Sequence, residues 1–463
     1  MNSSSFFLKS LLLLLLFQFA CEPEEIDMED ENDKYRIMTL NPGHFHAALV
    51  QKTHMEGVDN QVHVFAPEGD DLELHMERIE SFNTREDDPT NWDTEVYTGD
   101  DYLSRMLEEQ PGNIMVTAGN NRKKADYIYQ AVDEGINVLS DKPMAIDHEG
   151  WDKLEDAFKI AEQKNVLLYD IMTERHEVSS RLLRELIKDE GLFGELITGS
   201  DDEPAIYLES IHHLYKQVAG STLRRPPWYF DIEQQGEGIV DVTVHLVDLT
   251  MWTAFPDQII SYEEDVQMLQ AERWPTMVTR EEFEQITGKP EFPDYLTDQL
   301  DEDGVLPYYS NGEIDYLLNG HHMRVMVQWD YEAPPGSDDR HFKKIRGTRS
   351  NLVVRQDEDQ DFEATLYVEP ADGVTMEEVK SELDNTIERL QVDYPGADYK
   401  ETEYGLQLVI PDEFHYGHEA HFGMVAENFL QYLQEGALPD WEVPNMISKY
   451  YITTRAREMA KQD

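Results

Sequence analysis

Short apolar segments alternate with helical segments over the first third of this chain, and this alternation is the strongest constraint on its fold. The pattern predicts strands over residues 35–40, 61–66, 114–117, 136–139 and 166–170, a weaker strand over 95–98, and helices over 45–55, 100–110, 122–134 and 148–163. Strands separated by helices form parallel sheets through crossover connections. Ligands bind at the carboxyl ends of the strands in such sheets. We therefore expect an α/β domain with a site at that edge.

The second half of the chain has a different character. Helical patches continue to about residue 255, and strand-like runs follow at 322–329, 351–355, 365–368 and 403–410 before helical stretches at 417–434 and 447–461. These runs predict an α+β domain with a large, mostly antiparallel sheet. The expected divisions are a signal peptide at 1–20, an acidic linker at 21–33, a parallel-sheet domain at 34–172 and a C-terminal substrate or oligomerisation domain at 173–463.

The N-terminus resembles a bacterial lipoprotein signal. Lys9 precedes an apolar run from Leu11 to Phe19, after which come Ala20 and Cys21. The run is shorter than the roughly 20 residues that span a bilayer, and it suits the core of a signal peptide. We expect Cys21 to be lipidated and the protein to be exported and anchored in the cell envelope, periplasmic or at the surface. The alternative is a plain secretory signal with an incidental cysteine.

The charge of the chain limits its partners. The 463 residues include 96 Asp and Glu against 38 Lys and Arg, a formal net charge of −58. Such a surface repels phosphate backbones and anionic lipid headgroups, so we expect no nucleic-acid partner and membrane contact only through the lipid. Solvation in a salty environment explains the charge better than a cationic partner does. Cys21 is the only cysteine, which excludes an intramolecular disulfide.

Three strand ends carry the residues expected to hold a cofactor. A dinucleotide fold places a tight turn of small residues after its first strand, where backbone groups approach a pyrophosphate. Only one residue of that turn is a glycine here, and the acid expected after the second strand is replaced by Phe65-Ala66-Pro67, with Glu68 one step beyond. The simpler reading is a turn with surface histidines. The candidate cofactor-binding residues are Asn41, Gly43, His44, Phe45, His46, Ala118, Gly119, Asn120, Asp141 and Lys142.

A carboxylate and a histidine four residues apart form the next candidate. Asp241 and His245 share one face whether the segment is a helix or a strand. A carboxylate beside an imidazole raises its pKa and orients it, which makes an acid/base pair. An ordinary ion pair in a buried segment is the alternative.

Histidine is also abundant elsewhere, at His212-His213, at His321-His322, and at His415, His418 and His421. The last three have a spacing that places their nitrogens on one helical face, as zinc ligands do. A metal-dependent hydrolase therefore remains an alternative. Because the chain contains no HExxH sequence, we expect no metal.

The order of these motifs resembles the Gfo/Idh/MocA oxidoreductases, the relatives of glucose–fructose oxidoreductase and inositol dehydrogenase. The resemblance lies in the Gly43 turn, the strand-end Asp141-Lys142-Pro143 and the later Gly236-x-Gly238-x-x-Asp241-x-x-x-His245. Family members usually carry Glu where Asp141 stands. The resemblance implies a Rossmann-type domain followed by a second domain with an antiparallel sheet, and an exported lipoprotein subgroup with its own C-terminal oxidoreductase domain.

The resemblance also implies roles for particular residues. Lys142, Asp241 and His245 would be catalytic, with Lys142 contacting both the nicotinamide ribose and the substrate. The residues expected to bind substrate are Arg175, His212, His213, Lys216 and His245. We expect an NAD- or NADP-dependent oxidoreductase acting on a small carbohydrate or cyclitol, including the case of a glycoside-cleaving enzyme that recycles tightly bound NAD, and a homo-oligomer. A cofactor-free carbohydrate-binding lipoprotein is the competing reading.

Overall fold

Six parallel strands form the first sheet, in the order β3-β2-β1-β4-β5-β6. The computed structural model describes residues 35–462 apart from 219–220 and 335–336, so the expected signal peptide, linker and Cys21 lie outside the described residues. The strands are β1 (Ile37–Leu40), β2 (Gln61–Ala66), β3 (Asp93–Thr98), β4 (Ile114–Thr117), β5 (Asn137–Asp141) and β6 (Leu168–Ile171). This order is that of a Rossmann fold, so the predicted α/β class is confirmed.

Five helices connect these strands: α1 (His46–Leu49), α2 (Asp70–Thr84), α3 (Tyr102–Glu109), α4 (Asn121–Asp133) and α5 (His148–Lys164). The helix expected over 45–55 is wrong in length, since α1 has four residues. Helix α2 had no counterpart in the prediction. Its apolar signal is weak, because only Leu72, His75 and Ile79 are buried along its 15 residues.

Nine strands form the second sheet, in the order β10-β11-β12-β7-β13-β14-β15-β17-β16. All neighbours are antiparallel except β12 and β7, which run parallel. The bounds are β7 (Ile206–Tyr215), β10 (Val266–Val278), β11 (Leu306–Leu318), β12 (His321–Glu332), β13 (Arg340–Arg346), β14 (Ser350–Gln356), β15 (Thr365–Pro370), β16 (Asp398–Thr402) and β17 (Gly405–Val409), and a small hairpin pairs β8 (Gln217–Val218) with β9 (Ser221–Thr222). The predicted large, mostly antiparallel sheet is confirmed.

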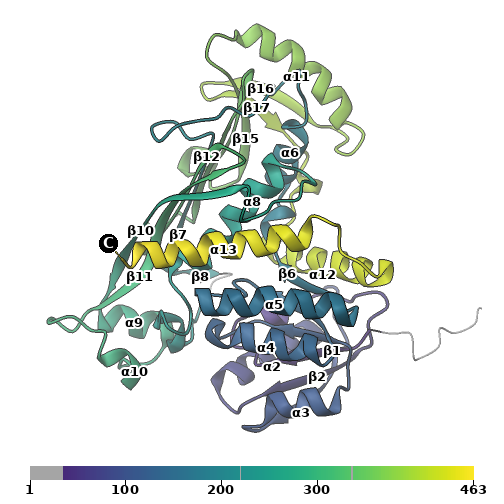
Figure 1. Ribbon diagram of the computed structural model, residues 1–463, viewed down its shortest axis with the longest axis vertical. Coiled ribbons are helices and arrows are strands. Elements are labelled where there is room, and N and C mark those ends of the chain that lie inside the picture. Colours follow the sequence, from purple (N-terminus) through teal and green to yellow (C-terminus); the bar gives the residue numbers. More distant parts are fainter. Residues whose placement is uncertain (1–34, 219–220, 335–336, 463) are drawn as a thin grey trace, which may run out of the picture. The chain divides into compact units, whose positions relative to one another are not determined.

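Helices cover one face of this second sheet (Figure 1). They are α6 (Val178–Leu186), α7 (Gly238–Asp241), α8 (Thr243–Ala254) and part of α13 (Glu442–Ala460), while α9 (Arg280–Thr287), α10 (Asp294–Thr297) and α11 (Met376–Leu390) lie in its connections. The short 3₁₀ turns are η2 (Thr173–Arg175), η3 (Pro227–Phe230), η4 (Glu358–Gln360) and η5 (Asp412–Phe414). Leu246, Val247 and Ile314 belong to the core between these helices and the sheet.

The last two helices return to the first sheet. Helix α12 (His418–Glu435) packs on α1 and β6, and α13 packs on α5. Phe422, Phe429 and Tyr450 from these helices belong to the same hydrophobic core as β1 and β4. The expected division at residues 172/173 thus separates the two sheets, yet the first core is completed from the C-terminus. Among the described residues, no helix is both long and apolar enough to cross a bilayer.

Candidate active site

A cavity of about 720 Å³ opens at the carboxyl ends of β1, β4 and β5 and is closed by the second sheet. Its lining draws on the turn after β1, the end of β5, η2, helices α7 and α8, the inner face of β7 and β13, and the start of α12. Five of its lining side chains are cationic in a chain that is strongly acidic overall: Arg78, Lys142, Lys216, Arg225 and Lys343. Carboxylates line it as well, among them Asp141, Glu174 and Asp241, so the cavity presents charges of both signs and suits a polar ligand.

Lys142 lies at the centre of this site. It follows β5 directly, and its Nζ donates a hydrogen bond of 2.9 Å to Asp241 Oδ1. Gln235 Nε2 donates to the other carboxylate oxygen of Asp241 at 3.0 Å. Burial raises the pKa of Asp241, but the Lys142 ammonium outweighs it, so the net pKa is lowered. An ammonium has three donors, which leaves Lys142 free to contact further oxygens.

The glycines of the 236–245 segment explain how Asp241 reaches this position. A Cβ at Gly238 would lie 1.7 Å from the Ser310 carbonyl oxygen on β11, so only glycine permits this approach of α7 to the sheet. Gly236 has a φ of +87°, in the left-handed region that favours glycine. The segment that carries Asp241 and His245 is helical: α7 ends at Asp241, and His245 lies on α8.

His245 lines the cavity but is not paired with Asp241. Its Nδ1 is buried without a hydrogen-bond partner among the described residues. Burial, followed by repulsion from Lys142, lowers the pKa of His245 to about 3, against an opposing effect of Glu174. The expectation that Asp241 orients His245 and raises its pKa is therefore wrong, because Asp241 is committed to Lys142 and the imidazole is held neutral.

The histidines of the first turn are not surface residues, which corrects the simpler reading of that turn. His46 is 8% exposed, and its Nδ1 lies 3.1 Å from each carboxylate oxygen of Asp141. His44 Nδ1 lies 3.8 Å from Asp141 Oδ2. Phe45, His44, His46, Asp141 and Lys142 all line the cavity.

The remaining candidates at the strand ends hold the turn. The N–H of His44 donates to the carbonyl of Ala118, and Asn41 Nδ2 donates to the Tyr127 hydroxyl. A Cβ at Gly119 would lie 2.6 Å from the Asn41 carbonyl oxygen, so this position also requires glycine. Asn120 Nδ2 donates to Gln234 Oε1 at 2.7 Å, a contact between the two halves of the protein.

The opposite wall of the cavity belongs to the second sheet. His212 Nε2 lies 2.6 Å from Ser210 Oγ, and its Nδ1 lies 2.8 Å from Asp339 Oδ2. His213 and Lys216 pair with the same carboxylate. His212 and Lys216 line the cavity, whereas His213 is buried behind it.

Glu174, Lys343 and His341 also line the cavity, although none of them is among the site residues expected from the sequence. They come from η2 and β13, and no motif links these elements. Burial raises the pKa of Glu174, but nearby positive charge, that of Lys343 above all, outweighs it, so the net pKa is lowered.

Arg175 lies elsewhere. It is 7% exposed, is not part of the cavity lining, and donates to Asp248 and Glu442. The structure thus gives no support to a substrate-binding role for Arg175. The alternative of a zinc face formed by His415, His418 and His421 is wrong, because α12 begins at His418 and His415 therefore does not share a helical face with the other two.

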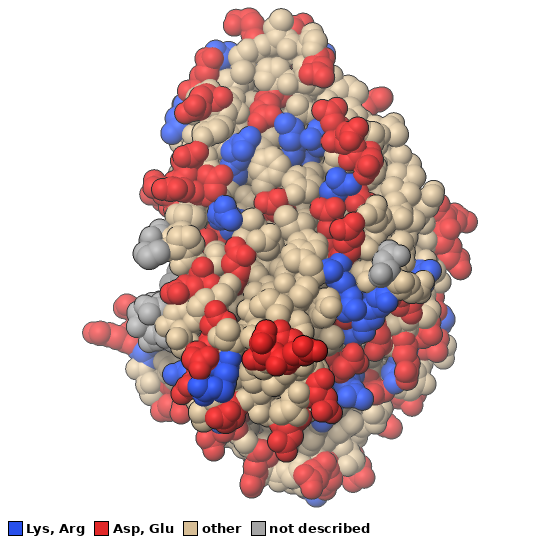
Figure 2. All heavy atoms as spheres, turned by 90° about the vertical axis from the view of Figure 1, so that its left-hand side faces the viewer, with Lys and Arg blue, Asp and Glu red and all other residues tan. Residues whose placement is uncertain are grey.

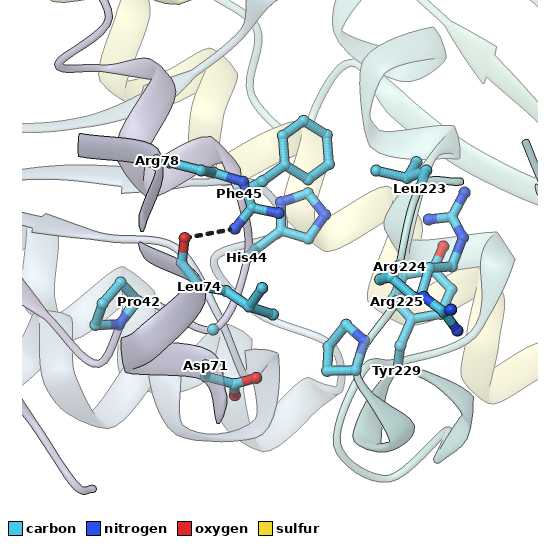
Figure 3. Close-up of a pocket in the computed structure, with 12 residues that line it drawn as sticks. Pro42, His44, Phe45, Asp71, Leu74, Arg78, Leu223, Arg224, Arg225 and Tyr229 are labelled. Carbon is cyan, nitrogen blue, oxygen red and sulfur yellow. Dashed lines mark hydrogen bonds between the residues drawn. The ribbon is translucent and has the colours of Figure 1, made fainter. Parts of the chain in front are cut away.

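Two smaller pockets continue the cavity along the edge of the first sheet. A narrow one of about 30 Å³ lies beside Gly43, with Arg78 on one side and Arg224 and Arg225 on the other (Figure 3). The next, of about 220 Å³, lies at the end of β2 and is lined by Glu68, Asp70 and Asp71 among others. Asp71 lines both of these pockets and accepts a hydrogen bond of 2.9 Å from Trp228 Nε1.

Comparison with known proteins identifies the family. Residues 182–461 match the family "Putative oxidoreductase C terminal domain". A crystal structure of a "putative oxidoreductase" from Parabacteroides merdae is 50% identical, covers 93% of this chain and 98% of its own, and superposes with a TM-score of 0.91. The chain belongs to the Gfo/Idh/MocA oxidoreductases.

More distantly similar solved structures share the fold alone. Levoglucosan dehydrogenase in complex with NADH and L-sorbose has a TM-score of 0.59 at 13% identity, over 93% of this chain and 97% of its own. A protein from Thermotoga maritima has a TM-score of 0.58 at 16% identity, over 92% and 98%. No curated protein matches this chain in sequence.

Proposed function

We propose that this protein is an NAD-dependent oxidoreductase that oxidises a hydroxyl group of a carbohydrate or cyclitol. One observation carries the proposal: the Lys142 ammonium, held by Asp241 at 2.9 Å, shares a cavity with the neutral imidazole of His245, whose Nδ1 has no hydrogen-bond partner among the described residues. An ammonium and a neutral base at one hydroxyl are what alcohol oxidation requires, since the oxygen becomes negative as its proton leaves. Levoglucosan dehydrogenase, which shares the fold, is seen with NADH and a sugar.

The three adjoining pockets fit a dinucleotide. Arg78 lines both the cavity and the narrow pocket beside Gly43, where a pyrophosphate needs a cation. A Cβ at Gly43 would lie 3.0 Å from Asp71 Oδ2 and 3.2 Å from Trp228, so a side chain at this position would narrow the passage and press on both groups. Lys142 would then contact the nicotinamide end.

The pocket at the end of β2 favours NAD over NADP. The sequence lacks the acid usual at this strand end, but Asp71, in the first turn of α2, brings a carboxylate to the same pocket. A carboxylate there accepts hydrogen bonds from ribose hydroxyls. With Glu68 and Asp70 it would repel a 2′-phosphate.

The chain's own residues account for the proton and the charge. His245, neutral at physiological pH, accepts the proton of the substrate hydroxyl. Lys142 donates a hydrogen bond to the same oxygen and stabilises its negative charge, while Asp241 holds the ammonium in place. The nicotinamide, when bound, supplies the hydride acceptor. Glu174 on η2, together with His212 and Lys343 on the second sheet, presents further polar groups to the cavity, which suits a substrate with several hydroxyls.

Substitution of the two central residues tests the proposal. Lys142→Ala and His245→Ala should each lower turnover by about two to four powers of ten on a panel of free sugars and glycosides. Binding of NADH, followed by its fluorescence, should change little, because its affinity comes mainly from the pyrophosphate and adenosine ends. Lys153→Ala and His148→Ala, on the surface of α5, are the matched controls and should leave both readouts unchanged.

Two results would contradict the proposal. Activity that survives Lys142→Ala would favour the hydrolase alternative. A wild-type protein that binds sugar but no NADH would favour the cofactor-free carbohydrate-binding alternative.

A further inference from the structure

Three potential metal ligands converge at the carboxyl ends of β1 and β5. We propose that His44, His46 and Asp141 form a binding site for a divalent transition-metal cation of the zinc type. Their ligand atoms all lie within 4.8 Å of one another. In a tetrahedral zinc site with bonds of about 2.0–2.1 Å, ligand atoms are about 3.3 Å apart. The observed separations from Asp141 are 3.1 Å to His46 Nδ1 and 3.8 Å to His44 Nδ1, which brackets that value.

The chemistry of the three groups suits a cation. Imidazole nitrogens and carboxylate oxygens are common zinc ligands, and the Nδ1 atoms of His44 and His46 both lie beside the Asp141 carboxylate. Asp141 is 3% exposed, and as a carboxylate it supplies the negative charge. The two rings pack edge to face with centroids 4.0 Å apart.

One ring nitrogen of this cluster lacks a hydrogen-bond partner among the described residues. His44 Nδ1 is buried and forms no hydrogen bond within the described residues, although it lies 3.8 Å from Asp141 Oδ2. Leaving such an atom unsatisfied costs about 1–3 kcal/mol. A cation bound between the three groups would satisfy His44, His46 and Asp141 together.

The neighbouring charges leave room for this cation. The Lys142 ammonium is held by Asp241, and Lys124 Nζ donates to the main-chain carbonyl of Asp141 at 2.8 Å rather than to its carboxylate. The other cluster with metal-ligand spacing consists of Asp201, Asp315 and His322, and it differs in the charges that surround it. Arg324 already donates to both of its carboxylates, so a protein cation fills that position.

The proposed metal site opens into the cavity in which we propose that the reaction takes place. All three ligands line the cavity that contains Lys142 and His245. Zinc sites with three protein ligands and a fourth position left for water or substrate are those found in enzymes, whereas structural sites are closed by four. An oxygen of the substrate would occupy the fourth coordination position. The sequence alone does not predict a metal site at these residues.

Metal titration of the whole protein tests this inference. The protein is stripped with a chelator, and Co²⁺ is added while its visible absorption is recorded; Zn²⁺ binding is measured by calorimetry, in both cases without nicotinamide. We expect one equivalent of each metal and a tetrahedral cobalt spectrum. His44→Gln and Asp141→Asn should each weaken metal binding strongly. The loss of a residue that only contacts a metal ligand costs about 10- to 100-fold in affinity, and we expect a larger loss here.

The controls are His322→Gln in the other cluster and His418→Gln in the same cavity, which should bind as the wild type does. His44→Gln is the decisive variant because His44 is only partly buried, and thermal melting verifies that it folds. Absence of binding at millimolar metal, full binding by folded His44→Gln, or loss of binding in His322→Gln would each overturn the inference. NADH binding, measured separately, reports on the proposed function, so either idea can fail alone.

Discussion

The charged residues buried away from the cavity hold the two halves of the protein together. Arg175 on η2 donates to Asp248 on α8 at 2.7 Å and to Glu442 at the start of α13 at 2.8 Å. Lys449, fully buried on α13, pairs with Asp248 and with Asp170 at the end of β6. Burial works against each charge alone, but together they satisfy one another. These ion pairs fix the segment 170–175, which includes Glu174, to α8 and α13.

We predict that Arg175→Met destabilises the protein without affecting substrate recognition. Removing one partner leaves Asp248 and Glu442 buried with less compensation, which typically costs about 3–5 kcal/mol. Urea unfolding should show this loss, while the KM of the folded variant stays near that of the wild type. Arg105→Met, which removes a surface pair with Glu109, is the control and should change stability little. A raised KM with unchanged stability would instead restore the substrate-binding role first expected for Arg175.

At the level of elements, strongly periodic segments could be predicted from the sequence. Strands β2 and β4 and helices α4 and α5 are predicted to within about two residues, because β2 alternates polar and apolar residues, β4 is almost wholly apolar, and the two helices are amphipathic. Strand β10 was missed because its side chains are partly exposed along most of its length. The site followed the same rule. Lys142 and His245 were found from local motifs, whereas Glu174, Lys343 and Asp71 reach the pockets only through tertiary folding.

Helix α2 provides a test of pH dependence. Both ring nitrogens of His75, which is 2% exposed, lack hydrogen-bond partners among the described residues. Burial lowers its pKa from 6.5 to about 4, so the unfolded chain binds more protons than the folded protein between these values. Stability therefore rises with pH from about 4 to 6.5 and is lost on acidification, by about 2 kcal/mol at pH 5 from this group.

We predict that His75→Leu removes this contribution. Melting temperature measured from pH 7 to pH 4.5 should fall less steeply in the variant, and at pH 5 the variant should be the more stable protein. His54→Leu, at a histidine with an exposed side chain, is the control and should keep the wild-type slope. An unchanged slope in His75→Leu would mean that other buried histidines, such as His176, whose pKa is also about 4, carry the effect.

The turn after β1 provides a test of the cofactor path. We predict that Gly43→Val weakens NADH binding by at least about tenfold, because its side chain would have to displace the Asp71–Trp228 hydrogen bond that lies against this position. Fluorescence titration measures the loss. Gly417→Ala, where an added Cβ meets nothing within 4 Å, should bind as the wild type does. Equal affinity in Gly43→Val would place the dinucleotide elsewhere.

For the whole molecule, charge is the dominant property. Acidic residues are spread over the face shown in Figure 2, with only small groups of basic side chains among them. The formal charge of −58 makes this surface repel itself at low ionic strength. We predict that the melting temperature rises steeply from dilute buffer to molar salt, as the Debye length falls from about 30 Å toward 3 Å. Differential scanning calorimetry at several NaCl concentrations measures this, with sucrose of matched osmolality as the control. A flat response would mean that the acids are compensated locally.

The same charge bears on how the protein meets a membrane. Its acidic surface is repelled by anionic headgroups, so we expect a covalently attached lipid to be the anchor. Cys21, after the apolar run and Ala20, is the residue we expect to carry it. Two or more acyl chains anchor stably, whereas loss of the thiol removes them all. We therefore predict that Cys21→Ser moves the expressed protein from the membrane fraction to the soluble fraction, while Ser5→Ala, upstream in the same segment, leaves it in the membrane. Fractionation in high salt followed by immunoblotting measures the distribution. A Cys21→Ser protein that stays in the membrane fraction under these conditions would show that the acyl group is not its anchor.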